Sequence, residues 1–212
     1  MIDIDTRLRV AQGIAKTETE ASQIVFEMLK SQRGHPQKPP PTVSDGWGGI
    51  REAMVEVYGK VPPYSGVGRP PTQKQPGDDW QYLQVVKQRE NGRIIGTELR
   101  VIYGDEEEVL AFLGKSTSYI ERSNLTSRHF NSRLTRKTLA FSKIVEMHKA
   151  AATLEDTYYN FVRPHKSLRL EVNHPDRRWK PRTPAMVSAL TDHLWTVKEL
   201  FLSVPIPVAG NT

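Results

Sequence analysis

Hydrophobic residues recur at helical spacing in two places in the first third of the chain. Thr17 and Glu20 form a capping box, and a set of apolar residues follows at intervals of three and four: Ala21, Ile24, Val25, Met28 and Leu29. This pattern predicts an amphipathic helix that ends near Ser31. A second apolar stripe, running from Ile50 to Tyr58, predicts another helix.

Alternating apolar and polar residues predict strands between and around these helices. Residues 4–14 alternate in this way, so we expect a strand there, entered through a turn at Asp5 and Thr6. Residues 42–44 are predicted to form a short strand. Residues 82–89 and 94–103 flank Asn91-Gly92, which is a strong signal for a β-hairpin. Residues 62–79 are rich in Pro, Gly and Lys and predict a mobile surface loop.

The second half of the chain is predicted to be mainly helical. Residues 105–108 are acidic and favour the start of a short helix. Residues 119–139 read as a helix whose two sides differ. One side contains Glu121, Asn124, Leu125, Arg128, Ser132 and Thr135, and the opposite side contains Tyr119, Ile120, Phe130 and Leu134. The acid therefore stands among basic and polar groups on a face that is free to meet a ligand.

Helical periodicity continues over residues 140–161 and is broken at Pro164. Residues 169–182 are predicted to be a polar, basic linker. Thr183 and Pro184 are suited to the N-cap and the first position of a further helix. A last helix is expected over residues 190–201.

The charge balance favours a polyanionic partner. The chain of 212 residues carries 30 Lys and Arg against 24 Asp and Glu, so its net charge is +6 and its pI is about 9.5. Nucleic acid is the first candidate partner. The chain has no cysteine, which excludes disulfides and thiolate metal sites. It shows no apolar run long enough to span a membrane and no signal peptide, so we expect a soluble, cytoplasmic protein.

Two acidic residues are candidate ligands for a divalent cation. Asp45 follows a predicted strand, and Glu121 lies on the basic helix. Two-metal phosphoryl transfer requires converging carboxylates, and Mg²⁺ prefers hard oxygen ligands. Each residue also has a plainer interpretation, because Asp-Gly is an ordinary turn and a lone Glu on a basic helix often makes a salt bridge. Trp179 stands beside Arg177, Arg178, Lys180 and Arg182, and could contact nucleic acid.

Several motifs, taken together, resemble transposases of the insertion-sequence-one family. They are Ser44-Asp-Gly-Trp47, Tyr119-Ile-Glu-Arg-Ser-Asn-Leu125, Arg133-Leu-Thr-Arg-Lys-Thr-Leu-Ala-Phe-Ser-Lys143 and Tyr159-Asn-Phe-Val-Arg-Pro-His-Lys-Ser-Leu168. These runs come in the order found in the family. The resemblance covers residues 1–168, and the helical residues 183–201 look like a terminal extension.

The resemblance implies an α/β fold with a ribonuclease-H-like core and DDE chemistry. It places the second catalytic acid on Asp45 and the third on Glu121, both as ligands of Mg²⁺ or Mn²⁺. The implied reaction is metal-dependent hydrolysis at transposon ends, followed by attack of the freed 3′ hydroxyl on target DNA. We expect an oligomeric active complex and a group of DNA-contacting residues: Arg122, Asn124, Arg128, Arg133, Arg136 and Lys137.

The chain also departs from the family pattern. The first catalytic acid of the family lies on a strand upstream of the segment that residues 1–14 resemble, so we expect that strand to be missing and the chain to be truncated. The resulting prediction is a catalytic domain over residues 1–168, with a hairpin-containing insert at about 62–113, followed by a basic linker and helical extension over 169–212. Three functions remain open: a transposase catalytic domain that is inactive alone, a non-catalytic DNA-binding regulator, and a nuclease using Asp3 or Asp5.

Overall fold

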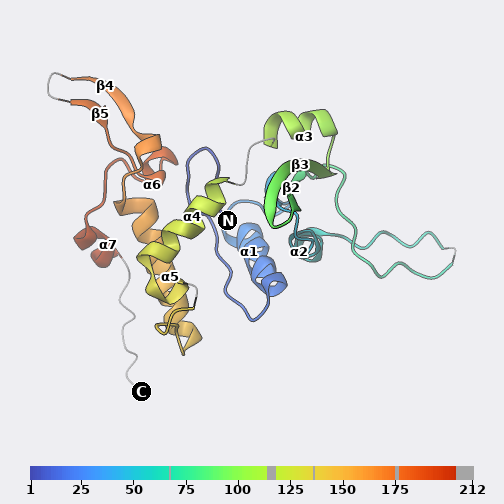
Figure 1. Cartoon of the computed structure of the whole chain (residues 1–212). Helices are drawn as coiled ribbons and strands as arrows, with labels where there is room; N and C mark the ends of the chain where they lie inside the picture. The colour runs from blue at the N-terminus through green and yellow to red at the C-terminus, as the bar shows by residue number, and fades with distance from the viewer. Residues whose placement is uncertain (67, 114–117, 136, 175–176, 204–212) are drawn as a thin grey trace. The chain divides into compact units, whose positions relative to one another are not determined.

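The structure is a computed structural model that divides into two compact units (Figure 1). The first unit comprises Met1 with Val10–Ile120, and the second comprises Ile2–Arg9 with Glu121–Thr212. The structure describes residues 1–66, 68–113, 118–135, 137–174 and 177–203; of residues 118–121, 173 and 174 it describes the backbone alone. The predicted division at residue 168 stays a prediction.

Two helices form one layer of the first unit. Helix α1 (Glu18–Gln32) begins where Thr17 Oγ1 accepts a hydrogen bond from the Glu20 amide at 3.2 Å, as the capping box predicts. Helix α2 (Gly49–Tyr58) packs against it, which confirms the second predicted helix. Their apolar sides share a core: Phe26, Leu29, Ala53, Met54, Tyr58, Trp80 and Tyr82. The rings of Phe26, Tyr58 and Trp80 meet edge to face along this core.

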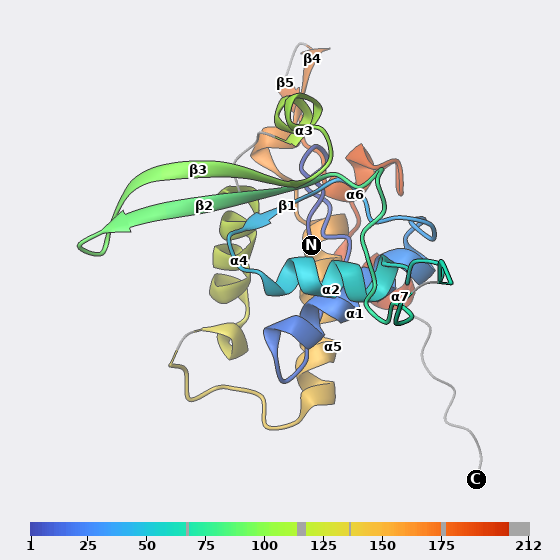
Figure 2. The same ribbon diagram turned by 90° about the vertical axis from the view of Figure 1, so that its right-hand side faces the viewer.

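A three-stranded sheet forms the next layer, in the order β1 (Thr42–Asp45), β2 (Tyr82–Glu90) and β3 (Arg93–Tyr103). Strand β1 pairs with β2 in parallel, and β2 pairs with β3 antiparallel. Asn91 and Gly92, with φ of 49° and 79°, make the turn of the predicted hairpin, which projects well beyond β1 (Figure 2). The hairpin is thus confirmed, and its first strand joins the same sheet as β1.

Helices cover both faces of this sheet. Tyr82 and Leu83 are neighbours on β2 and therefore point to opposite sides. Tyr82 enters the core with α1 and α2, whereas Leu83 packs with Val109 and Leu113 of α3 (Glu106–Leu113) (Figure 2). The amide of Glu108 donates to Asp105 Oδ1 at 3.1 Å, so the acidic run starts a helix as predicted. The observed architecture is mixed α/β.

The strand predicted over residues 4–14 is wrong. Asp3 Oδ1 accepts hydrogen bonds from the amides of Asp5 and Thr6 at 3.0 and 2.7 Å, and Arg7 adopts a φ of 64°. These local bonds close a turn, and the segment makes a single bridge between Ile2 and Arg9 in place of a ladder. The predicted turn at Asp5 and Thr6 is thus confirmed, although no strand follows it.

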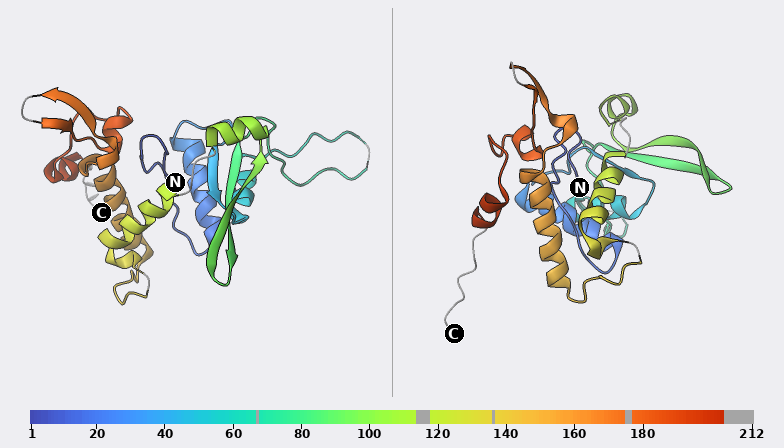
Figure 3. Two further views of the ribbon diagram at one scale, coloured as in Figure 1. Left: turned by 45° about the horizontal axis from the view of Figure 1, so that its top comes forward. Right: turned by 60° about the vertical axis from the view of Figure 1, so that its left-hand side comes forward.

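Helices α4 and α5 dominate the second unit, whose residues are seen from two further sides in Figure 3. Helix α4 (Ser118–Phe130) is followed by a 3₁₀ turn, η1 (Ser132–Leu134), and helix α5 (Val145–Thr157) continues into a π-helical turn, η2 (Tyr158–Val162). The break at Pro164 is confirmed. A 3₁₀ turn, η3 (Lys166–Leu168), comes next.

The predicted continuous helix over residues 119–139, and its extension over 140–161, is wrong in the middle. Asn131 adopts an extended conformation and its Oδ1 accepts a hydrogen bond from the Arg133 amide at 3.1 Å, which ends α4. Lys137 then takes a φ of 55°, which no helix accommodates. Residues 140–144 are irregular, and the helix resumes at Val145.

The predicted linker over residues 169–182 is also wrong, because it forms an antiparallel ribbon. Strand β4 (Leu170–His174) pairs with β5 (Arg177–Lys180). Thr183 Oγ1 caps the short helix α6 (Pro184–Val187) as predicted, but the last helix, α7 (Val197–Ser203), begins later than expected. Within the part of the chain that the structure describes, no helix combines the length and apolar character needed to cross a membrane.

Candidate functional site

Asp45 is the last residue of β1 and is exposed. Its Oδ1 accepts a hydrogen bond from the Trp47 amide at 3.3 Å, which folds the chain into a turn before α2. Its Oδ2 accepts no hydrogen bond from the residues that the structure describes. A carboxylate at the end of a strand, ahead of a helix, is thus left with an oxygen that can bind a cation.

Glycines make the turn after Asp45 possible. A Cβ on Gly49 would lie 2.3 Å from the indole of Trp47, so the ring covers the first residue of α2 at a distance that only glycine permits. A Cβ on Gly46 would lie 3.0 Å from Val86 on the neighbouring strand. The run Asp-Gly-Trp-Gly-Gly therefore packs tightly and fixes where the Asp45 backbone lies relative to the sheet.

A buried polar network supports this turn from below. Tyr82 Oη lies 2.7 Å from Ser44 Oγ and accepts a hydrogen bond from Gln84 Nε2 at 3.0 Å. Gln84 Nε2 also donates to the Trp47 carbonyl at 3.4 Å. Burial raises the pKa of Tyr82, with a smaller contribution in the same direction from the Asp45 carboxylate. Tyr82 therefore acts as a neutral hydrogen-bonding group beneath the strand end.

Helix α4 presents its predicted polar side to solvent. Arg122, Asn124 and Arg128 are exposed, whereas Ser123 on the other side is buried. The backbone of Glu121 lies in the same helix, and its side chain is outside the described residues. Arg128 follows Glu121 by seven positions, about two helical turns, and so lies on the same side.

The other predicted DNA contacts lie at and beyond the end of α4. Arg133 is exposed in η1, and Lys137 is exposed in the irregular segment that follows. Arg136 lies outside the described residues. Arg133 and Lys143 help to line an open hollow of about 270 Å³, together with residues 140–142, Ile144 and Met147. Helix α4 and the segment that follows it thus carry several exposed basic residues of the second unit.

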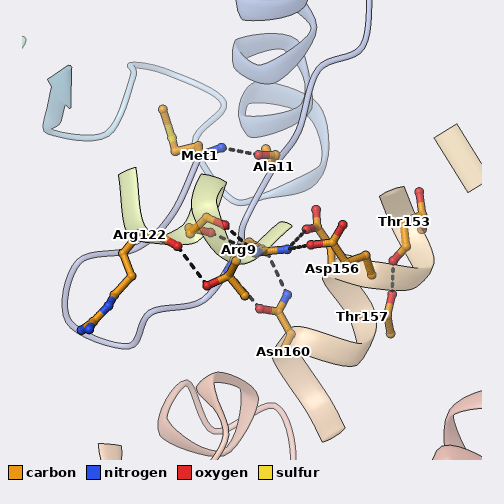
Figure 4. A network of polar contacts seen from close by, with 11 residues as sticks. Met1, Arg9, Ala11, Arg122, Thr153, Asp156, Thr157 and Asn160 are labelled. Carbon is orange, nitrogen blue, oxygen red and sulfur yellow. Dashed lines mark hydrogen bonds and ion pairs between the residues drawn. The ribbon is translucent and has the colours of Figure 1, made fainter. Parts of the chain in front are cut away.

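A buried arginine holds α4 in place (Figure 4). Arg9 Nε donates to Ser123 Oγ at 2.9 Å, and its Nη2 donates to the Ser123 carbonyl at 3.1 Å. Its Nη1 donates to Glu155 and Asp156 of α5 at 2.9 and 2.8 Å. The Arg9 guanidinium also lies 4.0 Å from the centroid of the Tyr159 ring. One side chain therefore fixes α4 against α5.

Asn160 completes this arrangement through the backbone of Arg9. Its Oδ1 accepts from the Arg9 amide and its Nδ2 donates to the Arg9 carbonyl, both at 2.9 Å. Sequence reasoning missed the roles of Arg9, Ser123 and Asn160. Ser123 and Asn160 lie in two of the motifs, but no spacing indicates their bonds to Arg9, because the bonded residues lie 114 to 151 positions apart.

The two candidate metal ligands belong to different units. Asp45 lies in the first unit and Glu121 in the second, so their convergence on one cation stays a prediction. Among the described side chains, no three of the residue types His, Cys, Asp and Glu gather closely enough to hold a metal ion. The structure does bring together Arg122, Asn124 and Arg128, three exposed polar residues of α4.

Residues 101–160 match the family model described as IS1 transposase. The chain resembles IS1 transposases. The matched segment starts in β3, contains α3, α4 and α5, and ends in η2. It includes Glu121 and Arg128 but neither Asp45 nor Arg9. Comparisons with curated proteins and with solved structures gave no match.

The resemblance to IS1 transposases agrees with the sequence motifs quoted above at the residues where the two overlap. The matched segment contains the Ile-Glu-Arg run of α4 and the Arg-Lys run that follows η1. It also contains Ser123, Glu155, Asp156 and Asn160, the residues that bind Arg9. The Arg9 contacts therefore stabilise the part of the chain that resembles these transposases.

Proposed function

We propose that this chain acts in DNA transposition as a DDE-type catalytic segment. The match of residues 101–160 to the IS1 transposase model is the observation that carries the proposal. It is supported by the position of Asp45 at the end of a strand and of Glu121 on a helix with basic residues. DNA is the substrate in this proposal, and a cytoplasmic location and an oligomeric active complex go with it.

The proposed core is ribonuclease-H-like. The parallel pair β1 and β2, with helices on both faces of the sheet, is compatible with that arrangement. The α/β layers place Asp45 at the carboxyl end of β1, where ligands commonly bind in open sheets with parallel strands. The antiparallel hairpin β2–β3 extends the same sheet.

Asp45 and Glu121 are the proposed ligands of Mg²⁺ or Mn²⁺. The free Oδ2 of Asp45 suits a cation that prefers hard oxygen ligands. When bound, the metal ions activate the attacking oxygen and stabilise the leaving oxygen of a phosphodiester. Because two carboxylates hold Mg²⁺ poorly by themselves, we expect the nicking and joining activity of this chain alone to be low, although measurable above background.

The basic surface of α4 has a separate role in the proposal. Arg122, Arg128 and Arg133 would bind DNA phosphates with their forked guanidinium groups, and Asn124 would donate from its amide. Arg136 and Lys137 follow Arg133 in the sequence and are proposed to bind DNA as well. The Arg9 contacts hold α4 rigidly, so its exposed side chains are presented to DNA in one orientation.

Strand cleavage and strand transfer provide the test. A supercoiled plasmid carrying the DNA that flanks the chain's own coding sequence is incubated with purified chain and Mg²⁺ or Mn²⁺. We expect metal-dependent nicking and joining above background, and its loss in both Asp45→Asn and Glu121→Gln. Glu52→Gln on α2 and Glu146→Gln on α5 are the matched controls, because each is an exposed acid in the same unit as one of the two candidate ligands.

A second candidate function is a non-catalytic DNA-binding regulator of transposition. The excess of positive charge and the exposed arginines of α4 favour it independently of the acids. This function predicts salt-sensitive DNA binding that needs no metal and is unchanged in Asp45→Asn and Glu121→Gln. Metal-dependent nicking that disappears in both variants would exclude it as the sole function.

A further inference from the structure

The positive charge of the chain is concentrated in one segment. Residues 163–182 contain seven Lys and Arg residues and two acids, so this segment alone provides nearly all of the net charge of +6. It lies beyond the part that resembles IS1 transposases, which ends at residue 160. The proposed roles of Asp45, Glu121 and α4 leave this charge unexplained.

The structure arranges much of this segment as a two-stranded ribbon. Strands β4 and β5 pair with Leu170 opposite Lys180, and with Glu171 opposite Trp179. The ribbon extends away from the helices of the second unit (Figures 1 and 3). A two-stranded ribbon holds its side chains in fixed positions, on both of its faces, where a partner can bind them. An irregular linker does not fix its side chains in this way.

Trp179 orders the arginines of the ribbon. The guanidinium carbon of Arg169 lies 3.9 Å from the centroid of a Trp179 ring, and that of Arg178 lies at 5.2 Å. Arg178 Nε also donates to Glu171 Oε1 at 2.8 Å. Stacked guanidinium groups lose less side-chain freedom on binding, so the ribbon is preorganised for an anionic partner.

Two further cations of the ribbon are available to a partner. The side chains of Arg177 and Lys180 are exposed, and neither makes a hydrogen bond or an ion pair with the residues that the structure describes; Lys180 interacts with the exposed Asp192 carboxylate only through its charge. Exposed charges of the same sign that lie close together repel one another. An anion that binds between positive charges removes this repulsion. The ribbon therefore combines ordered arginines with free cationic groups.

We propose that the β4–β5 ribbon is a second DNA-binding element, which binds the phosphate backbone of duplex DNA apart from the catalytic acids. The forked guanidinium groups match phosphate oxygens. Base stacking on Trp179, as in single-strand binding, is disfavoured because Arg169 already covers the ring. The proposal shares the class of partner with the proposed function but does not depend on metal chemistry.

DNA binding by the full chain in EDTA tests this element. Fluorescence anisotropy with a short labelled duplex of mixed sequence is measured over a range of salt concentrations. The double variant Arg177→Ala/Lys180→Ala is expected to bind the duplex roughly tenfold more weakly at low salt, and the slope of log K against log salt falls by about 1.8. Neither substitution removes a side-chain hydrogen bond or an ion pair among the described residues, and the only interaction weakened is that of Lys180 with the exposed Asp192, so we expect the fold to be retained.

The matched control removes the same charge elsewhere in the second unit. Lys149→Ala/Lys198→Ala changes two exposed lysines on α5 and α7. Equal losses in the two double variants would overturn the proposal, because they would show a general effect of charge. Stronger binding of the ribbon to single-stranded nucleic acid or to polyglutamate than to the duplex would also overturn it.

A third variant tests the role of the ring. Trp179→Leu keeps an apolar side chain but removes the surface on which Arg169 stacks, so we expect weaker duplex binding with an unchanged salt slope. Because these measurements contain EDTA, they are independent of the strand-cleavage test. Loss of nicking in Asp45→Asn with normal ribbon binding, or the reverse, separates the two proposals.

Discussion

Arg9 Nη1 donates a hydrogen bond of 2.8 Å to Oδ1 of Asp156, a residue 147 positions further along the chain. The side chain of Arg9 is 6% exposed and that of Asp156 is 23% exposed, so the pair is largely removed from water. Burial raises the pKa of Asp156 although the Arg9 guanidinium acts in the opposite direction. The N-terminal turn is in this way tied to the helices that resemble IS1 transposases.

Replacing Arg9 with methionine should destabilise the second unit strongly. The substitution leaves Glu155 and Asp156 as neighbouring buried acids without their cation, and such losses typically cost about 3–5 kcal/mol. Chemical denaturation followed by circular dichroism measures the change. Arg122→Met, an exposed substitution on α4, is the control and should change stability by less than about 0.5 kcal/mol.

A compensated variant separates charge from packing at this position. Arg9→Met combined with Glu155→Gln and Asp156→Asn removes the cation and both acids together. We expect it to recover a large part of the stability lost in Arg9→Met, because no unpaired charge is left buried. If the single variant is as stable as the parent, the structural role given to Arg9 is wrong.

Several elements were predictable because their signals are local. Thr17 and Glu20 predicted the start of α1, and Asn91-Gly92 predicted the hairpin turn, since each pattern stabilises one conformation within a few residues. The exposed polar side of α4 followed from helical spacing, but Phe130, which was expected on the packed side, is 59% exposed. The resemblance to IS1 transposases was recognised from motifs that the family model partly covers.

Other features could not be predicted, for two reasons. Some depend on contacts between residues that are far apart in the sequence, and others on a side chain that competes with the helix for a backbone amide. Arg9 and Asn160 meet only in the folded unit, so no spacing in the sequence reveals them. Helix α4 ends because the side chain of Asn131 competes for the backbone, although the apolar periodicity continues past it. The ribbon was mistaken for a linker because its charged residues hide the strand pattern.

His165 should make stability depend on pH in the acid range. Burial, followed by the positive charge of Arg163, lowers the pKa of His165 from 6.5 to about 4. The folded state therefore binds a proton less readily than the unfolded state. Stability is fully present above about pH 6.5 and is lost as the pH falls toward 4, by roughly 1–2 kcal/mol after allowing for solvent screening.

The variant His165→Gln identifies the source of this dependence. Its side chain does not titrate, so the stability difference between pH 7 and pH 4.5 should become smaller by the His165 contribution. Thermal unfolding at a series of pH values measures it. His129→Gln is the control, because that histidine is exposed on α4. An unchanged pH profile in His165→Gln would contradict the assignment.

Gly49→Ala should disturb the turn that carries Asp45. The added methyl group would lie 2.3 Å from the indole of Trp47, so the ring must move. We expect a change in tryptophan fluorescence and a loss of about 1–3 kcal/mol in stability, as for other overpacked sites. Gly48→Ala is the matched control, since a Cβ there meets no atom within 4 Å.

Metal-directed cleavage of the protein backbone tests the central claim, that Asp45 and Glu121 bind the same metal. Fe²⁺ replaces Mg²⁺ in the DNA-bound chain, and ascorbate with hydrogen peroxide generates radicals that cut nearby peptide bonds. The account predicts cuts near both residues, competed by excess Mg²⁺ and lost together in Asp45→Asn and in Glu121→Gln. Cuts near Asp45 that persist in Glu121→Gln, or cuts near neither residue, would contradict it.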